Sequence, residues 1–169
     1  MVNRTRQAGF TLVEILIVVV ILGILAAIVI PQFTSASESA KASSLTSQLQ
    51  TIRSQLQLYQ IQHNGSYPTI ADLQANDNAW DPMVQPHTYD GTTNTYPTDP
   101  ADANLGPYLQ QPPKNAFTNS TSVVATAEAD AGWEYDETTG QVKAVLPAGA
   151  DPAELGLSES DYVHLGGGG

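Results

Sequence analysis

The stretch GFTLVEILIVVVILGILAAIVIP, residues 9–31, decides the fold class, because it is apolar almost throughout and long enough to cross a bilayer. At a rise of about 1.5 Å per residue, a helix over residues 10–30 is about 30 Å long, which matches the hydrocarbon thickness of a membrane. An ordinary secretory signal has a shorter apolar core, of about 7–15 residues. We therefore expect this segment to stay on the mature protein as a membrane helix.

The charges that flank the apolar segment predict its orientation. Arg4 and Arg6 precede it, and Lys41 is the first basic residue that follows it. Positive residues are preferentially retained on the cytoplasmic side of a membrane. We therefore expect the N-terminus in the cytoplasm and the rest of the chain on the other side.

Glu14 is a carboxylate within this apolar segment. A charged residue inside a spanning helix costs roughly 2.5–3.5 kcal/mol, so it generally has a function and a partner. The residues alone leave two interpretations open. Either Glu14 binds a partner within the membrane, or it reaches the interface from its place one turn inside the segment.

The motif G-F-T-L-V-E after a short basic leader resembles the processing site of type IV prepilins and type II secretion pseudopilins. The resemblance implies that a prepilin peptidase cleaves between Gly9 and Phe10, and that the new N-terminus at Phe10 is methylated. It also implies that Glu14 neutralises the Phe10 amine of a neighbouring subunit in a filament. Breaking a buried ion pair costs about 3–5 kcal/mol, so this pair would set the register between subunits.

Gly23 and Pro31 interrupt the apolar segment. Proline removes a backbone donor and clashes with the preceding turn, so we expect a kink or a local loss of helix at Pro31. The resemblance implies the same change, because pilin-like filaments often lose helical structure between such a glycine and proline. An ordinary glycine of a membrane helix is the alternative interpretation of Gly23.

Residues 32–64 predict a second, amphipathic half of the same helix. Its apolar residues recur at spacings of 4, 3, 4 and 3 and define what we call the stem stripe: Leu45, Leu49, Ile52, Leu56 and Tyr59. Leu58 and Ile61 are expected to widen the stripe near its end. The stripe is too narrow and short for a stand-alone coiled coil, so we expect it to pack on the chain's own C-terminal domain.

Residues 65–165 are rich in turn residues and predict a small globular head. A short helix capped by Thr69 is expected within residues 70–76, and a strand within residues 120–127. Residues 132–146 predict a β-hairpin, because apolar and polar residues alternate on both sides of a turn. The expected class is α+β: a pilin-like lollipop whose long helix has a protruding apolar half and an amphipathic half packed on a small antiparallel sheet.

Three segments of the head resemble the G-type major pseudopilins of type II secretion. They are YPT at residues 67–69, LGPYLQQPPKNAFT at residues 105–118 and GWEYDETTGQVKA at residues 132–144. Residues 76–104, mostly predicted as irregular loop, form an insertion relative to that family. The whole chain is thus divided into a leader, an apolar helix, a stem, a head and a glycine tail: residues 1–9, 10–31, 32–64, 65–165 and 166–169.

The absence of cysteine excludes disulfides and thiolate zinc sites. By resemblance, G-type pseudopilins bind calcium where type IV pilins close a C-terminal loop with a disulfide. Asp151, Glu159 and Asp161 are candidate calcium ligands, although their spacing is not that of an EF-hand loop. A solvated acidic end is the simpler interpretation, and no other cofactor is expected.

Catalysis and nucleic-acid binding are not expected. The formal net charge of −11 repels a phosphate backbone, and no nucleophile, phosphate-loop or zinc-protease motif occurs. His63, His87 and His164 lie far apart in the sequence and lack the spacing of metal ligands. His63, at the end of the stem, suits the helix dipole there and is assigned a structural role.

The combined interpretation is a structural subunit of a helical filament, most similar to the major pseudopilin of a type II secretion system. The resemblance implies as partners further copies of the chain, a prepilin peptidase, an inner-membrane platform protein, an assembly ATPase and minor pseudopilins. It implies a single span in a bacterial inner membrane with a periplasmic head, and then a periplasmic or surface filament. Two alternatives stay open: the major pilin of a type IV pilus, for adhesion, motility or DNA uptake, and a membrane-anchored binding module that never polymerises.

Overall fold

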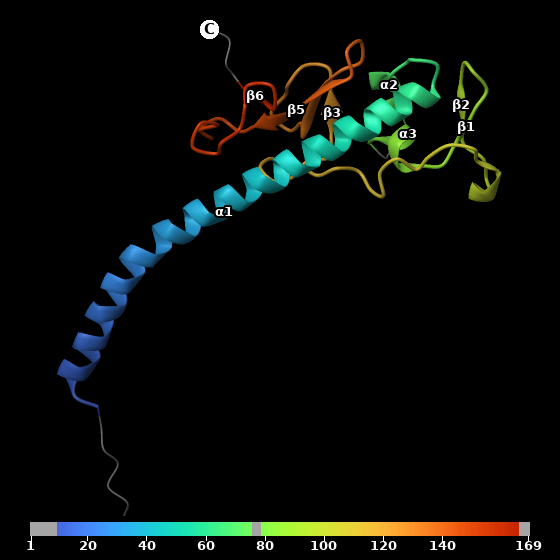
Figure 1. Cartoon of the computed structure of the whole chain (residues 1–169). Helices are drawn as coiled ribbons and strands as arrows, with labels where there is room; N and C mark the ends of the chain where they lie inside the picture. The colour runs from blue at the N-terminus through green and yellow to red at the C-terminus, as the bar shows by residue number, and fades with distance from the viewer. Residues whose placement is uncertain (1–9, 76–78, 166–169) are drawn as a thin grey trace, which may run out of the picture. The chain divides into compact units, whose positions relative to one another are not determined.

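The structure is a computed structural model that describes residues 10–75 and 79–165. It divides into two compact units, Met1–Ser39 and Ala40–Gly169, and both contain part of one helix, α1 (Leu12–Gln62) (Figure 1). In its described residues, the second unit also holds two short α-helices, a 3₁₀-helix and six strands, so the predicted α+β class is confirmed. These elements are α2 (Ile70–Leu73), α3 (Asp81–Val84), β1 (Thr88–Tyr89), β2 (Asn94–Thr95), η1 (Pro100–Asp102), β3 (Val123–Val124), β4 (Trp133–Asp136), β5 (Gln141–Leu146) and β6 (Tyr162–His164).

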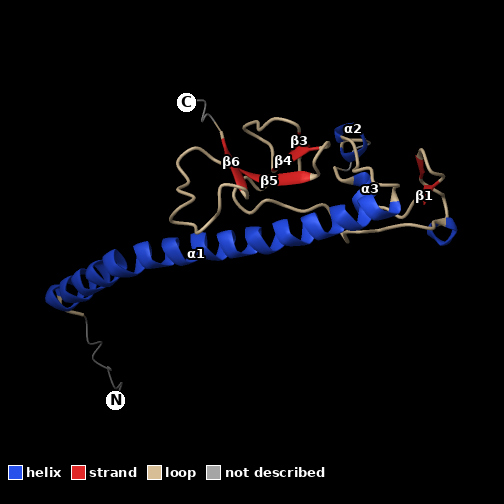
Figure 2. Ribbon diagram, turned by 45° about the horizontal axis from the view of Figure 1, so that its top comes forward, coloured by secondary structure: helices blue, strands red, loops and turns tan. Residues whose placement is uncertain are grey.

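The stem stripe forms one wall of the head's hydrophobic core. Each of its five residues is at most 3% exposed. They pack with apolar residues of β3, β4 and β5, among them Val123, Trp133, Tyr135, Val142 and Leu146. Figure 2 shows these strands along one side of the C-terminal half of α1. The predicted packing of the stripe on the chain's own sheet is therefore confirmed.

Leu58 and Ile61 do not belong to this core. Their side chains are 40% and 77% exposed, so the expected widening of the stripe is wrong. Each residue of an α-helix is rotated by about 100° from the one before it, which places Leu58 well away from the direction of Tyr59. The sheet covers only the narrow face that the stripe presents.

The main sheet has the strand order β3-β4-β5-β6. The predicted hairpin is present as the antiparallel pair β4 and β5, with Trp133 opposite Ala144 and Tyr135 opposite Val142. The two edge strands differ from the expectation, because β3 runs parallel to β4 and β6 runs parallel to β5. Parallel neighbours cannot be joined by the two-residue turn of a hairpin. Residues 125–132 connect β3 to β4, and residues 147–161 connect β5 to β6. The four-stranded sheet is therefore mixed, whereas the two-stranded sheet of β1 and β2 is antiparallel.

Two local predictions about turns and caps are also confirmed. Thr69 caps α2: its hydroxyl accepts the Asp72 amide at 3.1 Å, while the Asp72 carboxylate accepts the Thr69 amide at 3.0 Å. This reciprocal pair is a capping box. Gly140 closes the turn between β4 and β5 at a φ of 69°, and a side chain there would overlap the ring of Tyr67.

The insertion contributes to the core, although the sequence predicted mostly loop. In its described part, Trp80 and Met83 are completely buried. The Trp80 ring lies edge-on to Trp133, with 6.5 Å between ring centroids, and its Nε1 donates to the carbonyl of Thr121 at 2.9 Å. The insertion is thus folded onto the same hydrophobic core as the sheet.

Asn115 lies in the loop that precedes β3. It is fully buried, and its Nδ2 donates to the carbonyls of Gly132 and Val145, both at 2.8 Å. Its Oδ1 accepts the Phe117 amide at 2.8 Å. Buried polar groups are stable only when they are hydrogen-bonded, and Asn115 meets this requirement by linking the loop to the sheet.

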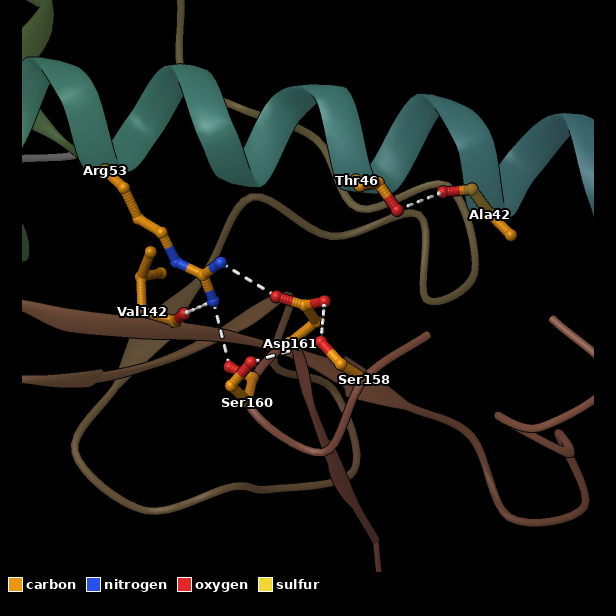
Figure 3. A network of polar contacts seen from close by, with 7 residues as sticks. All are labelled: Ala42, Thr46, Arg53, Val142, Ser158, Ser160 and Asp161. Carbon is orange, nitrogen blue, oxygen red and sulfur yellow. Dashed lines mark hydrogen bonds and ion pairs between the residues drawn. The ribbon is translucent and has the colours of Figure 1, made fainter. Parts of the chain in front are cut away.

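Arg53 ties α1 to the C-terminal segment (Figure 3). Its Nη1 lies 2.7 Å from Asp161 Oδ1, and its Nη2 donates to the carbonyls of Val142 and Ser160 at 3.0 and 2.9 Å. Ser158 also donates to the Asp161 carboxylate. Burial alone would raise the pKa of Asp161, but the hydrogen bonds from Ser158 and Arg53, with the charge of Arg53, hold that pKa below its ordinary value.

Leu49→Ala is expected to destabilise the head by about 2–5 kcal/mol, because it leaves a cavity in the core. Leu58→Ala is the matched control on the same helix, and surface changes of this kind usually alter stability by less than about 0.5 kcal/mol. Urea unfolding of the full chain in mild detergent, followed by the fluorescence of the buried Trp80 and Trp133, measures both. Equal losses for the two variants would contradict the assignment of the stripe.

Asp161→Asn is expected to lower stability by about 1–3 kcal/mol at neutral pH, because it removes a charge-assisted contact with Arg53. Since the folded-state pKa of Asp161 is depressed, the stabilisation is fully present above the unfolded value and is lost as the pH falls through the folded value. The difference between wild type and variant in free energy of unfolding should therefore shrink below about pH 5. Lys114→Gln, at an exposed site, controls for loss of a charge. A difference that is independent of pH would refute the role of this pair.

Candidate functional site

The start of α1 brings together Thr11 and Glu14. The Thr11 amide and hydroxyl each donate to Glu14 Oε2 at 2.8 Å, and the Glu14 amide donates to Thr11 Oγ1 at 3.2 Å. This reciprocal arrangement is a capping box, with Thr11 as the N-cap and Glu14 as the third helical residue. Glu14 therefore caps its own helix in the single chain. The T-x-x-E spacing of residues 11–14 carried this signal, which the interpretation of Glu14 from the sequence missed.

The apolar side chains that follow are exposed on every side of the helix. Their exposed fractions run from 80% for Leu12 to 41% for Val29, and Phe10 and Phe33 at the two ends are 83% and 72% exposed. By length and composition α1 can cross a membrane. An apolar surface of this extent marks a contact with a membrane or with other proteins. The first unit thus presents a surface for lipid or for packed helices.

Helix α1 is continuous through Gly23 and Pro31. The expected local loss of helix is therefore not present in the single chain. A proline removes one intrahelical hydrogen bond while the surrounding residues keep theirs, so a long helix can continue past it. Loss of helix within an assembled filament stays a prediction. Gly9, and with it the predicted cleavage site, lies outside the described residues.

The candidate calcium ligands have other partners. Asp151 Oδ1 accepts the Ala153 amide at 2.9 Å, and Asp161 forms its ion pair with Arg53. Over residues 10–75 and 79–165, no three histidine, aspartate or glutamate side chains form a group that could hold a metal ion. Calcium binding by Asp151, Glu159 and Asp161 stays a prediction, and the Arg53 guanidinium already supplies a positive charge at Asp161.

Two of the three histidines meet in the head, although they lie far apart in the sequence. His63 Nε2 and His87 Nε2 are 3.1 Å apart, and the two residues are 2% and 0% exposed. Asn94 Oδ1 lies 3.0 Å from His63 Nε2. His63 follows Tyr59 by four residues and so continues the stem stripe, which was a signal of its burial. No pattern around His87 predicted the contact, because the insertion brings it there.

Aromatic rings surround this histidine pair. Tyr59 stacks on His63 with 3.6 Å between ring centroids, and Tyr108 lies 5.9 Å from His87. Burial lowers the pKa of His87, against a hydrogen bond with Gln85 that raises it, and repulsion by His63 lowers it further. Burial likewise raises the pKa of Tyr59 and of Tyr108 to about 12. At neutral pH the rings around the pair are therefore uncharged.

Comparisons with known proteins agree with both parts of the chain. Residues 4–30 match the family model of the prokaryotic N-terminal methylation motif. The type II secretion system core protein G of Pseudomonas aeruginosa is 39% identical over 101 residues, which is 58% of this chain and 70% of the relative. The protein of the same name in Klebsiella pneumoniae is 38% identical over 100 residues, or 56% and 69% of the two chains. No solved structure gives a significant match.

A longer alignment reaches over nearly the whole chain. The type II secretion system core protein G of Escherichia coli K12 is 29% identical over 161 residues, which is 95% of this chain and 92% of the relative. The similarity therefore includes the head as well as the apolar helix. With its capped Glu14, its exposed apolar helix and these relatives, the chain belongs to the family of the type II secretion system core protein G.

Proposed function

We propose that this chain is the major pseudopilin of a type II secretion system, a non-enzymatic subunit that polymerises through its apolar helix. The observation that carries the proposal is the helix surface from Leu12 to Ile30, which is apolar and exposed on all sides in a chain of the core protein G family. A bilayer can cover this surface before assembly, and the helices of other subunits can cover it afterwards. A membrane-anchored binding module that never polymerises would need only the bilayer to cover this surface.

Processing at Gly9 is the first step of the proposed pathway. The match to the methylation motif over residues 4–30 and the basic residues Arg4 and Arg6 support cleavage between Gly9 and Phe10 by a prepilin peptidase, followed by methylation of Phe10. Cleavage before the apolar segment leaves that segment on the mature chain. It also creates a positive amine at Phe10, close in sequence to the carboxylate of Glu14.

Glu14 then sets the register between subunits. In a packed bundle of helices, the Phe10 amine of one subunit meets the Glu14 carboxylate of its neighbour, where the low dielectric constant makes the attraction strong. A subunit in the wrong register would leave a charge unpaired, at a cost of about 3–5 kcal/mol. The capping box supports this role, because Thr11 holds the carboxylate at the very start of the helix.

The remaining partners follow from the proposed system. The precursor spans the inner membrane once, with its N-terminus in the cytoplasm and its head in the periplasm. A platform protein and an assembly ATPase add subunits to a filament that minor pseudopilins complete. The acidic heads, which hold 15 of the 17 acidic residues, form the filament surface.

Gly9→Leu is expected to abolish processing, because a bulky side chain does not fit where a peptidase accepts glycine. The measurement is the size of the chain on a gel after co-expression with a prepilin peptidase, with mass spectrometry of the N-terminus. Gly23→Ala, at a helical position where an added side chain meets no neighbouring atom, is the control for an altered glycine. A mature chain that begins at Phe10 in the Gly9→Leu variant would contradict the assigned cleavage site.

Glu14→Gln and Glu14→Ala separate capping from charge. Glutamine retains the capping box, since it can accept the Thr11 amide, but it has no charge for a neighbour's amine. If the ion pair sets the register, both variants should be inserted and processed, and both should form few filaments. Filament yield by electron microscopy and sedimentation provides the measurement. Normal assembly of Glu14→Gln with failure of Glu14→Ala would show that capping matters and that the ion pair does not.

A deletion strain distinguishes the pseudopilin from a type IV pilin. Loss of the chain should abolish export of proteins through the outer membrane and leave surface pili, twitching motility and DNA uptake intact. The opposite pattern would assign the chain to a surface pilus. A chain that is never cleaved or polymerised would be a membrane-anchored binding module.

A further inference from the structure

The buried pair of His63 and His87 is not used by the proposed filament function. His63 lies directly after the end of α1, and His87 directly before β1, within the insertion. Asn94, at the start of β2, places its Oδ1 3.0 Å from His63 Nε2. Three segments of the head therefore direct polar atoms to one point.

The outer nitrogens of both rings are engaged by carbonyl groups. His63 Nδ1 is 2.8 Å from the Tyr59 carbonyl oxygen, and His87 Nδ1 is 3.1 Å from that of Gln85. A carbonyl oxygen only accepts hydrogen bonds, so each Nδ1 must carry the proton that it donates. Each neutral ring then presents a lone pair at Nε2, and these two atoms face each other at 3.1 Å.

Asn94 adds a third lone pair. Its Nδ2 donates to the Tyr59 hydroxyl at 2.7 Å, which turns the acceptor Oδ1 toward His63 Nε2. His63 Nε2 thus has two other acceptors at 3.1 and 3.0 Å, and their lone pairs repel that of His63 unless a cation lies among them. Buried polar atoms need a partner, so the arrangement calls for one.

We propose that His63, His87 and Asn94 bind a divalent transition-metal ion of the Zn²⁺ class. Two nitrogen ligands at about 2.0–2.1 Å from a tetrahedral zinc ion lie about 3.3 Å apart, close to the distance between the two Nε2 atoms. Imidazole ligands suit zinc, copper and nickel rather than calcium or magnesium. Metal-bound histidines usually donate their second nitrogen to a carbonyl or carboxylate, and both rings here do so.

A cavity borders two of the three proposed ligands, His63 and Asn94. It has a volume of about 180 Å³ and is lined by His63 and Asn94 together with Ser66, Asp72 and Thr93. A water molecule from the cavity can complete a fourth coordination position, and the Asp72 carboxylate favours the approach of a cation. Bound metal would link the end of α1 to the insertion. This inference concerns the head alone and does not depend on the proposed filament function.

Zinc titration of the full chain tests the proposal. The purified chain in mild detergent is treated with a chelator, dialysed and titrated with ZnCl₂ by calorimetry. Wild type should bind one zinc ion per chain, and His63→Ala and His87→Ala should each weaken binding at least about tenfold, equivalent to about 1.4 kcal/mol. His164→Ala removes a histidine outside the cluster and should bind as wild type does. Absence of binding, or equal binding by all four proteins, would overturn the proposal.

Asn94→Asp provides a second test, in which a proposed ligand is replaced by a stronger one and not removed. A carboxylate is a stronger zinc ligand than an amide, so affinity should rise, and zinc should increase the melting temperature more than in wild type. X-ray absorption of the zinc-loaded wild type should show two imidazole ligands. An Asn94→Asp variant that binds no tighter, or a spectrum without imidazole, would refute the site. A shared proton would then be the cation between the rings.

Discussion

The structure depends on one requirement: the apolar surface of α1 has to be kept out of water. From Leu12 to Ile30 the side chains are apolar on every side, and none is more than about three-fifths buried in the single chain. Water cannot solvate such a surface without a large free-energy cost, since each apolar Å² removed from water contributes about 25 cal/mol. The environment of the first unit is therefore set by the helix itself. An apolar environment, such as lipid or packed helices, covers such a surface.

In the second unit, the stem stripe of α1 is buried within the chain itself. Beyond residue 40 the large apolar residues of α1 that are buried belong to this stripe, and the chain's own sheet covers them. Polar contacts then hold the covering layer in place: Arg53 binds the C-terminal segment, and Asn115 links a loop to the sheet. One helix thus has a stretch that needs partners and a stretch that supplies its own.

The sequence predicted those features that depend on neighbouring residues. The stem stripe, the Thr69 cap and the hairpin of β4 and β5 each follow from spacing over a few residues, and each is present. The features that were missed depend on contacts between distant segments. Arg53 meets Asp161 across 108 residues, Trp80 packs on Trp133, and His63 meets His87 through the fold of the insertion. No local periodicity encodes such pairs. The capping box of Glu14 is local, and the T-x-x-E spacing of residues 11–14 encodes it.

The capping box has a consequence for the subunit addition that we propose. Both hydrogen bonds from Thr11 go to the same oxygen of Glu14, Oε2, and they restrain the side chain in the single chain. A glutamate that is free to rotate loses up to about 2 kcal/mol of conformational entropy when it is immobilised. Here folding of the helix has already removed most of that freedom. In the proposed filament, the amine of a neighbouring subunit would therefore meet a carboxylate that is already restrained.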